Sequence, residues 1–338
     1  MQRRAFICGL AGPVLAASER DFLGRTSPAG VILFARNVES PDQVRRLIAD
    51  AQEAAGGDGR MLIMVDQEGG RVQRLREPHW PRYPAARAFS NLRRDDREKA
   101  RQAASLCAQM MAHDLRDLGF NTTCAPVLDV PVPGSDNIIG DRAYAEETEA
   151  VIELGGAVAE GLLAGGILPV MKHIPGHGRA MADSHLALPR VETPLAELQA
   201  HDFLPFRALR RLPMAMTAHV VFSAVDPSAP VTVSEKAIRE VIRGHIGFDG
   251  LLMSDDLSMR ALSGTIEERA RASFAAGCDL ALHCNGNMEE MEAVAAVSPY
   301  LEDAALRRSE SAFAQLREPQ AFDREAAEEA RLESLAGC

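Results

Sequence analysis

The stretch GILPVMKHIPGHGRAMADSH, residues 166–185, joins an apolar run to a polar loop that carries one lysine and three histidines. The apolar part, 167–171, has the length and character of a buried strand. The proline and glycines of 174–178 break any helix, so the histidines lie on a loop rather than on one helical face. Polar side chains on a loop held by a buried strand often form a site. This stretch therefore predicts a strand whose carboxyl end carries chemistry.

The same pattern recurs along the chain, with short apolar runs that alternate with segments of helical periodicity. The predicted strands are 6–10, 31–34, 61–65, 125–128, 167–171, 214–217, 251–253 and 280–282. The predicted helices are 43–55, 98–118, 147–164, 195–211, 234–244, 266–276 and 288–297. Continuously apolar strands that alternate with helices indicate a parallel sheet buried on both faces. Eight such units predict an α/β fold, a single (β/α)8 TIM-type barrel.

The ends of the chain fit this barrel. The start, MQRRAFICGLAGPVLAAS (1–18), superficially resembles a signal peptide, but the barrel needs its apolar part as the first strand. The tail, 301–338, is rich in Ala, Glu and Arg and is predicted to be helical and packed outside the barrel. Because no linker divides the chain, we expect one domain over 1–338.

Composition narrows the function classes. The 338 residues are 46% hydrophobic and 25% charged, as in ordinary globular proteins. A net charge of −11 argues against a nucleic-acid groove. Six scattered cysteines without a CxxC pair favour free thiols in a reducing compartment over disulfides or a zinc site. No apolar run approaches the roughly 18 residues that a membrane helix needs.

Polar residues follow five of the predicted strands directly, and in a barrel they share one rim. They are DQEGGR (66–71), Asp129, Lys172 with His173, His219, and Asp255 with Asp256. Arg74 and Arg142 lie a few residues beyond two of these strand ends. We therefore expect the active site on this rim, with His219 and Asp129 as supporting residues.

Asp255 suggests covalent chemistry, and Asp183 with His185 on the loop suggests acid–base chemistry. Asp255 suits a glycosidase nucleophile, although Asp also caps helices, which is a sufficient explanation for Asp256. Asp183 and His185 either form a dyad, in which the carboxylate orients the imidazole as an acid–base group, or are neighbours on a turn.

The basic residues suggest a polar ligand. Lys172 and His173 could bind sugar hydroxyls or pair with Asp129, and Lys172 could instead form an imine. Asp66 with Arg74 and Arg142 either binds hydroxyls or forms an ion-pair network on the rim.

Metal chemistry is the main chemical alternative, since His173, His177, His185 and Asp183 are all possible ligands. The loop has neither the HxH nor the HExxH spacing of zinc sites, so we expect no metal. His177, which lies between two glycines, is expected to be structural.

These motifs together resemble one family. DQEGGRVQRL (66–75), APVLDV (125–130), IGDR (139–142), KHIPGHG (172–178), DSH (183–185) and SDDLSM (254–259) resemble bacterial β-N-acetylhexosaminidases of glycoside hydrolase family three. The resemblance runs from GVILFARN (30–37) to AGCDLALHCNG (276–286). The chain has a short, single-domain form, which looks like the cytoplasmic enzyme of cell-wall recycling. That enzyme is linked to cell-wall biogenesis, cell shape, the cell cycle and cell division.

The resemblance implies specific roles. Asp255 would be the nucleophile of a retaining mechanism, His185 the general acid/base and Asp183 its orienting partner. The residues that would bind the terminal N-acetylglucosamine are Asp66, Arg74, Arg142, Lys172 and His173. The Gly and Pro content of 174–178 further suggests a mobile loop that brings His185 to bound substrate.

The implied substrate is N-acetylglucosaminyl-β-1,4-anhydro-N-acetylmuramic acid, with or without its peptide. We expect a monomer that acts on this small carbohydrate, with no cofactor, no metal, no nucleic acid and no membrane. The alternative function is a non-catalytic sugar-binding or regulatory barrel. Intact Asp255, Asp183 and His185 favour the hydrolase, because a binding protein needs no nucleophile. An imine-forming lyase that uses Lys172 is a more distant alternative.

Overall fold

The computed structural model describes residues 2–57, 59–181, 184 and 188–336. Over these residues, eight parallel strands close into a barrel in the order β1-β12-β11-β9-β7-β6-β3-β2. The barrel strands are β1 (Arg4–Gly9), β2 (Pro28–Leu33), β3 (Leu62–Val65), β6 (Thr122–Thr123), β7 (Leu168–Ile174), β9 (Met214–Thr217), β11 (Leu251–Asp256) and β12 (Leu280–His283). The predicted TIM-type barrel is confirmed.

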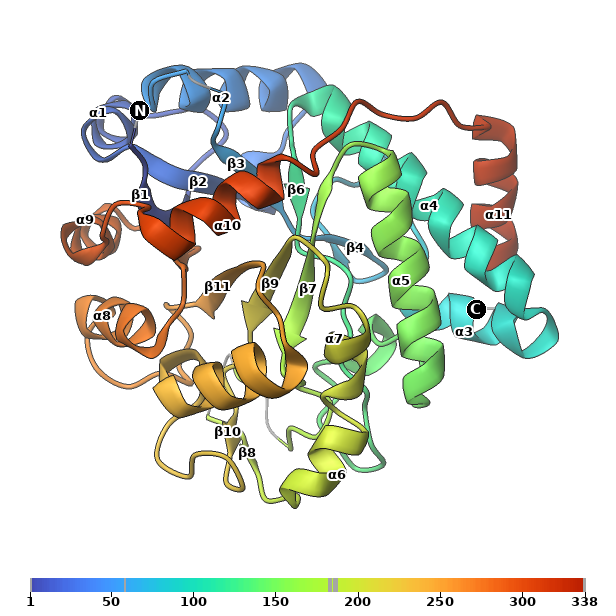
Figure 1. The fold of residues 1–338 in the computed structure, drawn as a ribbon. Helices are drawn as coiled ribbons and strands as arrows, with labels where there is room; N and C mark the ends of the chain where they lie inside the picture. Colours follow the sequence, from blue (N-terminus) through green and yellow to red (C-terminus); the bar gives the residue numbers. More distant parts are fainter. Residues whose placement is uncertain (1, 58, 182–183, 185–187, 337–338) are drawn as a thin grey trace.

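Helices surround this barrel, as Figure 1 shows. They are α1 (Ala17–Thr26), α2 (Pro41–Ala54), α3 (Ala86–Asp95), α4 (Arg97–Leu118), α5 (Thr148–Ala164), α6 (Leu195–Ala200), α7 (Leu204–Ala208), the π-helix η4 (Ala237–Ile246), α8 (Ile266–Ala276), α9 (Met288–Val297), α10 (Asp303–Phe313) and α11 (Arg324–Ala336). Short 3-10 turns lie at η1 (Ala35–Asn37), η2 (Gly140–Arg142) and η3 (Val231–Val233). Small two-stranded sheets pair β4 (Gln67–Gly69) with β5 (Val72–Gln73), and β8 (Arg190–Val191) with β10 (Val221–Phe222).

Both faces of the barrel strands are buried, which explains their unbroken apolar sequences. Ile7 and Val170 belong to the cluster inside the barrel. Their chain neighbours Phe6 and Met171 belong to the cluster between the barrel and the helices. Since successive side chains of a strand point to opposite faces, one apolar run fills both clusters.

The fourth barrel strand is not where the sequence predicts it. We expected 125–128, but the strand is β6, three residues earlier, and only Val127 of the expected segment makes an isolated bridge, to Lys172. The hydrophobic pattern does not reveal this strand, because the residues in it and directly before it are polar. The side chain of Asn121 replaces ladder bonds by accepting from the Ile63 N–H and donating to the Met61 carbonyl, and the Thr123 hydroxyl donates to the Val65 carbonyl.

One predicted helix is also wrong. The segment expected as a helix over 195–211 forms two short helices, α6 and α7. Pro205 occupies the first turn of α7, where a missing N–H costs nothing, but it cannot continue a helix from α6.

The tail contributes to the floor of the barrel. Leu301 and Ala312, at the ends of the α10 region, join the cluster that fills the barrel interior. In Figure 1 α10 lies across the barrel opening, whereas α11 packs on the outer side against α4.

The single-domain organisation over 1–338 stays a prediction. The apolar N-terminal segment is a barrel strand, since β1 pairs with β2 and β12. Within the described ranges, no helix combines the length and apolarity needed to cross a membrane.

Candidate active site

A pocket of about 190 Å³ opens where the barrel strands end. At roughly 30 Å³ for each water, this volume corresponds to about six waters, which is the scale of one sugar ring rather than a chain. The predicted residues that line it are Asp66, Arg74, Arg142, Lys172, His173 and Asp255. The structure therefore brings together all the predicted site residues that it describes.

Strand β7 supplies two consecutive side chains to this pocket. In a regular strand Lys172 and His173 would point to opposite faces. The register between β7 and β9 shifts between Lys172 and Ile174, and such an irregularity re-aims side chains. Both residues consequently line the pocket.

A tight hairpin after β3 supplies the carboxylates. Strand β4 turns back into β5 through Gly69 and Gly70, both of which have positive φ. A Cβ on Gly69 would lie 2.2 Å from the Pro84 carbonyl oxygen, so only glycine fits there. Asp66 and Glu68 line the pocket, whereas the Gln67 side chain accepts from the backbone N–H groups of Arg74 and Leu75.

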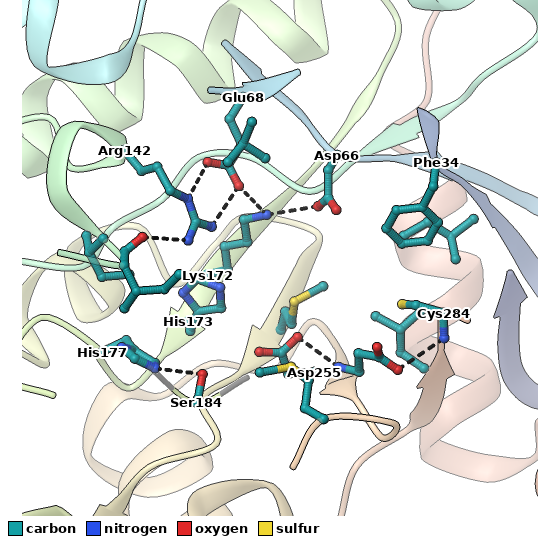
Figure 2. A pocket seen from close by; sticks show the side chains of 18 of the residues that line it. Phe34, Asp66, Glu68, Arg142, Lys172, His173, His177, Ser184, Asp255 and Cys284 are labelled. Atoms are coloured by element: carbon teal, nitrogen blue, oxygen red, sulfur yellow. Dashed lines mark hydrogen bonds and ion pairs between the residues drawn. The ribbon is translucent and has the colours of Figure 1, made fainter. Parts of the chain in front are cut away.

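Four of these side chains form a continuous ion-pair network, drawn in Figure 2. Arg142 donates from Nε and Nη2 to the two oxygens of Glu68, each at 2.8 Å. Lys172 Nζ lies 2.6 Å from Glu68 Oε1 and 3.1 Å from Asp66 Oδ1. A fifth residue, Arg74, extends the network by donating from Nη2 to Asp66 Oδ2 at 3.0 Å.

The network keeps its members charged. Burial alone would raise the pKa of Asp66 and of Glu68, but the adjacent Lys172, Arg74 and Arg142 hold both below their usual range. Burial would lower the pKa of Lys172, yet the two carboxylates raise it. A lysine held protonated is a poor imine nucleophile, which weighs against the lyase alternative.

Asp255 reaches the pocket from the other side, at the end of β11. The β11–β12 register shifts between Met253 and Asp256, where the chain turns toward the pocket. The Asp255 carboxylate accepts the Asp256 N–H at 2.8 Å, and the Asp255 N–H donates to the Thr217 hydroxyl at 3.3 Å.

The neighbouring Asp256 has a different environment. Its carboxylate accepts from the N–H groups of Ser258 and Cys284 and from the Ser258 hydroxyl. Buried His219 donates from Nε2 to the Asp256 carbonyl oxygen at 3.0 Å. These contacts hold the chain around Asp255. Because its carboxylate already accepts protein donors, Asp256 has a structural role.

Asp129 anchors the start of the histidine loop. It is fully buried and lies 2.7 Å from His173 Nδ1, and its other oxygen accepts the N–H groups of His173 and His177. Of the two partners considered for Asp129, His173 is correct, and Lys172 pairs with Asp66 and Glu68 instead.

The described part of that loop is closely packed. His177 is buried and lies 3.1 Å from the Ser184 hydroxyl through Nε2. A Cβ on Gly178 would lie 2.0 Å from the Val130 carbonyl oxygen, so this glycine permits close approach of two chain segments. Loop mobility stays a prediction. Asp183 and His185 lie outside the described residues.

Acidification should destabilise the protein through His177. Burial, and secondly the adjacent His173, lowers the pKa of His177 to about 4. The unfolded chain binds this proton near pH 6.5, so the stability is complete above pH 6.5 and falls as the pH drops toward 4. Urea unfolding should show a loss of about 2 kcal/mol from this histidine between pH 8 and pH 5.

His177→Asn should flatten this part of the pH dependence of the unfolding free energy. His79→Asn is the matched control, because His79 is exposed and its replacement should leave the slope as in the wild type. An unchanged slope in His177→Asn would contradict the assignment.

Sequence reasoning missed two contributors to the pocket. Glu68 has no predicted role, although Asp66 and Glu68 are two residues apart directly after β3, and in extended chain this spacing places side chains on one face. Phe34 lines the pocket beneath the Arg74 guanidinium, 5.4 Å from its ring centre, and offers an apolar face for a sugar. No sequence signal distinguishes this phenylalanine from a core residue.

Within the part of the chain that the structure describes, no group of three or more His, Cys, Asp or Glu side chains is placed to hold an ion. Five described cysteines are buried free thiols: Cys8, Cys107, Cys124, Cys278 and Cys284.

Comparison with known proteins gives consistent matches. The model of the family described as "Glycosyl hydrolase family 3 N terminal domain" matches residues 12–311. The curated Beta-hexosaminidase of Alkalilimnicola ehrlichii is 43% identical over 299 residues, which cover 87% of this chain and 83% of the relative. The crystal structure of native NagZ from Neisseria gonorrhoeae superimposes with a TM-score of 0.87 at 32% identity, covering 100% of this chain and 98% of that one. NagZ in complex with N-trifluoroacetyl-D-glucosamine matches with the same score, identity and coverage.

Proposed function

Because this chain belongs to glycosyl hydrolase family 3 and is a glycoside hydrolase, we propose that it is a retaining exo-β-N-acetylglucosaminidase. The proposed substrate is the peptidoglycan fragment N-acetylglucosaminyl-β-1,4-anhydro-N-acetylmuramic acid, with or without peptide. The reaction releases the terminal N-acetylglucosamine. We further propose that the enzyme is a cytoplasmic monomer of cell-wall recycling.

The observation that carries the proposal is the composition of the pocket at the strand ends. Asp255 faces a space the size of one sugar, whose opposite wall consists of charged donors and acceptors. Sugars bind through hydroxyls that both donate and accept, so such a wall suits them. A pocket for one ring also favours removal of a terminal residue.

Available donors support the sugar-binding roles of Lys172, Arg142 and Arg74. Contacts to described residues occupy two of the three Lys172 donors. The buried Nε–H of Arg74 has no hydrogen-bond partner in the described ranges. Asp66 can accept hydroxyls beside its ion pairs, and His173, oriented by Asp129, completes the proposed set.

In the proposed mechanism, Asp255 attacks the anomeric carbon as the bond to the leaving oxygen breaks, and His185 protonates that oxygen. In the second step His185 takes a proton from water, the water oxygen attacks the same carbon, and the Asp255 carboxylate leaves. Asp183 orients His185. An imidazole acid avoids the like-charge coupling that separates the pKa values of two adjacent carboxylates.

The names of the relatives support the substrate class. Beta-hexosaminidase is the name of the curated relative, and NagZ binds an N-acylated glucosamine.

The decisive experiment is hydrolysis of 4-nitrophenyl N-acetyl-β-glucosaminide followed by proton NMR. The β anomer of free N-acetylglucosamine should form first, and the α anomer should follow by mutarotation. First formation of the α anomer would disprove retention. Tight sugar binding without release of nitrophenol would instead establish the non-catalytic sugar-binding barrel.

A further inference from the structure

The unassigned residue of the site is Glu68, which lies at the centre of its ion pairs. Its side chain is 6% exposed, and it contacts the two cations proposed to bind the sugar. Arg142 meets both carboxylate oxygens and Lys172 meets one of them. This carboxylate is therefore occupied by protein donors.

Glu68 fixes the orientation of both cations. Two parallel hydrogen bonds hold the plane of the Arg142 guanidinium, and its Nη1 donates to the Ile138 carbonyl oxygen at 3.3 Å. A lysine side chain has no comparable plane and is oriented only by its acceptors, here Glu68 and Asp66. The remaining N–H groups of both residues are consequently directed by where Glu68 lies.

Glu68 also offsets the repulsion between the cations. Without it, Lys172 and Arg142 would be two neighbouring buried charges with Asp66 as the nearest acidic partner of Lys172. Buried like charges separate or lose a proton, and either change would misplace donors that a sugar needs.

We propose that Glu68 is a positioning residue, which sets Lys172 and Arg142 for binding the terminal sugar without contacting the sugar itself. This inference rests on the proposed function. It assigns a role to Glu68, for which the predicted nucleophile, acid/base and sugar-binding residues leave none. It predicts that the loss of Glu68 weakens sugar binding through the two cations rather than through folding.

The test compares Glu68→Gln with wild type in folded, purified protein. The amide has the same shape but no charge and places an NH2 donor toward two cations. We expect a KM increase of about 10-fold to 100-fold for 4-nitrophenyl N-acetyl-β-glucosaminide, and an equal rise in the Kd of free N-acetylglucosamine, since charge-assisted bonds are worth this much. Glu68→Asp, which keeps the charge, should recover part of the loss.

Glu153→Gln is the matched control. Glu153 also pairs with two arginines, Arg93 at 2.8 Å and Arg97 at 3.0 Å, and its side chain is 16% exposed, but it does not line the pocket. Its replacement should lower the unfolding midpoint without changing KM or Kd. An equal effect on KM from both variants would reduce Glu68 to a structural residue.

A double variant tests whether Glu68 acts through Lys172. Glu68→Gln should weaken N-acetylglucosamine binding by a smaller factor in the Lys172→Met background than in the wild type, because one of the two positioned cations is already gone and only Arg142 remains. Losses that multiply would overturn the proposal, as would an unchanged KM in Glu68→Gln. A wild type that neither hydrolyses the nitrophenyl substrate nor binds N-acetylglucosamine would overturn the proposed function and this inference together.

Discussion

Asp255→Ala is expected to lower kcat/KM for 4-nitrophenyl N-acetyl-β-glucosaminide by at least about 10³-fold, or ~4 kcal/mol of transition-state stabilisation. The alanine leaves no group to form the covalent intermediate, whereas the wall around Lys172 and Arg142 remains. The Kd for N-acetylglucosamine should therefore change far less than the rate. Steady-state kinetics and calorimetric binding together measure both quantities.

Asp256→Asn is the neighbouring control for this variant. Its carboxylate accepts protein N–H and O–H groups, and an amide oxygen can still accept part of them. We expect a loss in kcat/KM far smaller than that of Asp255→Ala. Equal rates for wild type and Asp255→Ala would disprove the nucleophile assignment.

His185→Ala is expected to reduce the rate in proportion to the basicity of the leaving group. With poor leaving groups the missing proton should cost about 10²-fold to 10⁴-fold, the usual contribution of general acid catalysis. With a dinitrophenyl leaving group the first step needs little protonation and should stay close to the wild-type rate. The slope of log kcat/KM against leaving-group pKa measures this difference.

The same variant should accumulate the covalent intermediate. With a good leaving group, glycosylation of Asp255 remains fast, but water lacks its general base in the second step. Mass spectrometry should detect one added N-acetylglucosaminyl residue, and azide, which needs no base, should release it as the β-glycosyl azide. A uniform loss across leaving groups, or no azide rescue, would contradict the acid/base role.

The barrel could be predicted because the apolar composition of its strands indicates that both of their faces are buried. The runs near Ile63, Val170 and Leu252 are apolar on both faces, and only a sheet buried on both sides accommodates that pattern. Strand β6 could not be found in this way. Directly before β6, the Asn121 amide bonds to the backbone of Ile63 and Met61, and a polar side chain that replaces a backbone bond looks like a loop residue.

The candidate site was predictable in its members but not in its connections. Strand ends collect polar residues on one rim, so Asp66, Lys172 and Asp255 could be grouped from the order of the elements alone. Which of them pair could not be read, because the partners are distant in sequence. Arg142 and Glu68 are 74 positions apart, and Lys172 and Asp66 are 106 apart.

The amino-acid sequence was sufficient to predict the alternation of strands and helices, the rim that carries the site, and the motifs that mark the family. These follow from periodicity and from the short-range order of residue types. The contacts of Glu68 with Lys172 and Arg142, and of Asp129 with His173, are known only from the folded chain. This is because a buried carboxylate pairs with whichever cations the closed barrel brings within hydrogen-bond distance, and those cations are distant in sequence. A register shift beside Lys172 lets both Lys172 and His173 line the pocket, and no local pattern encodes it.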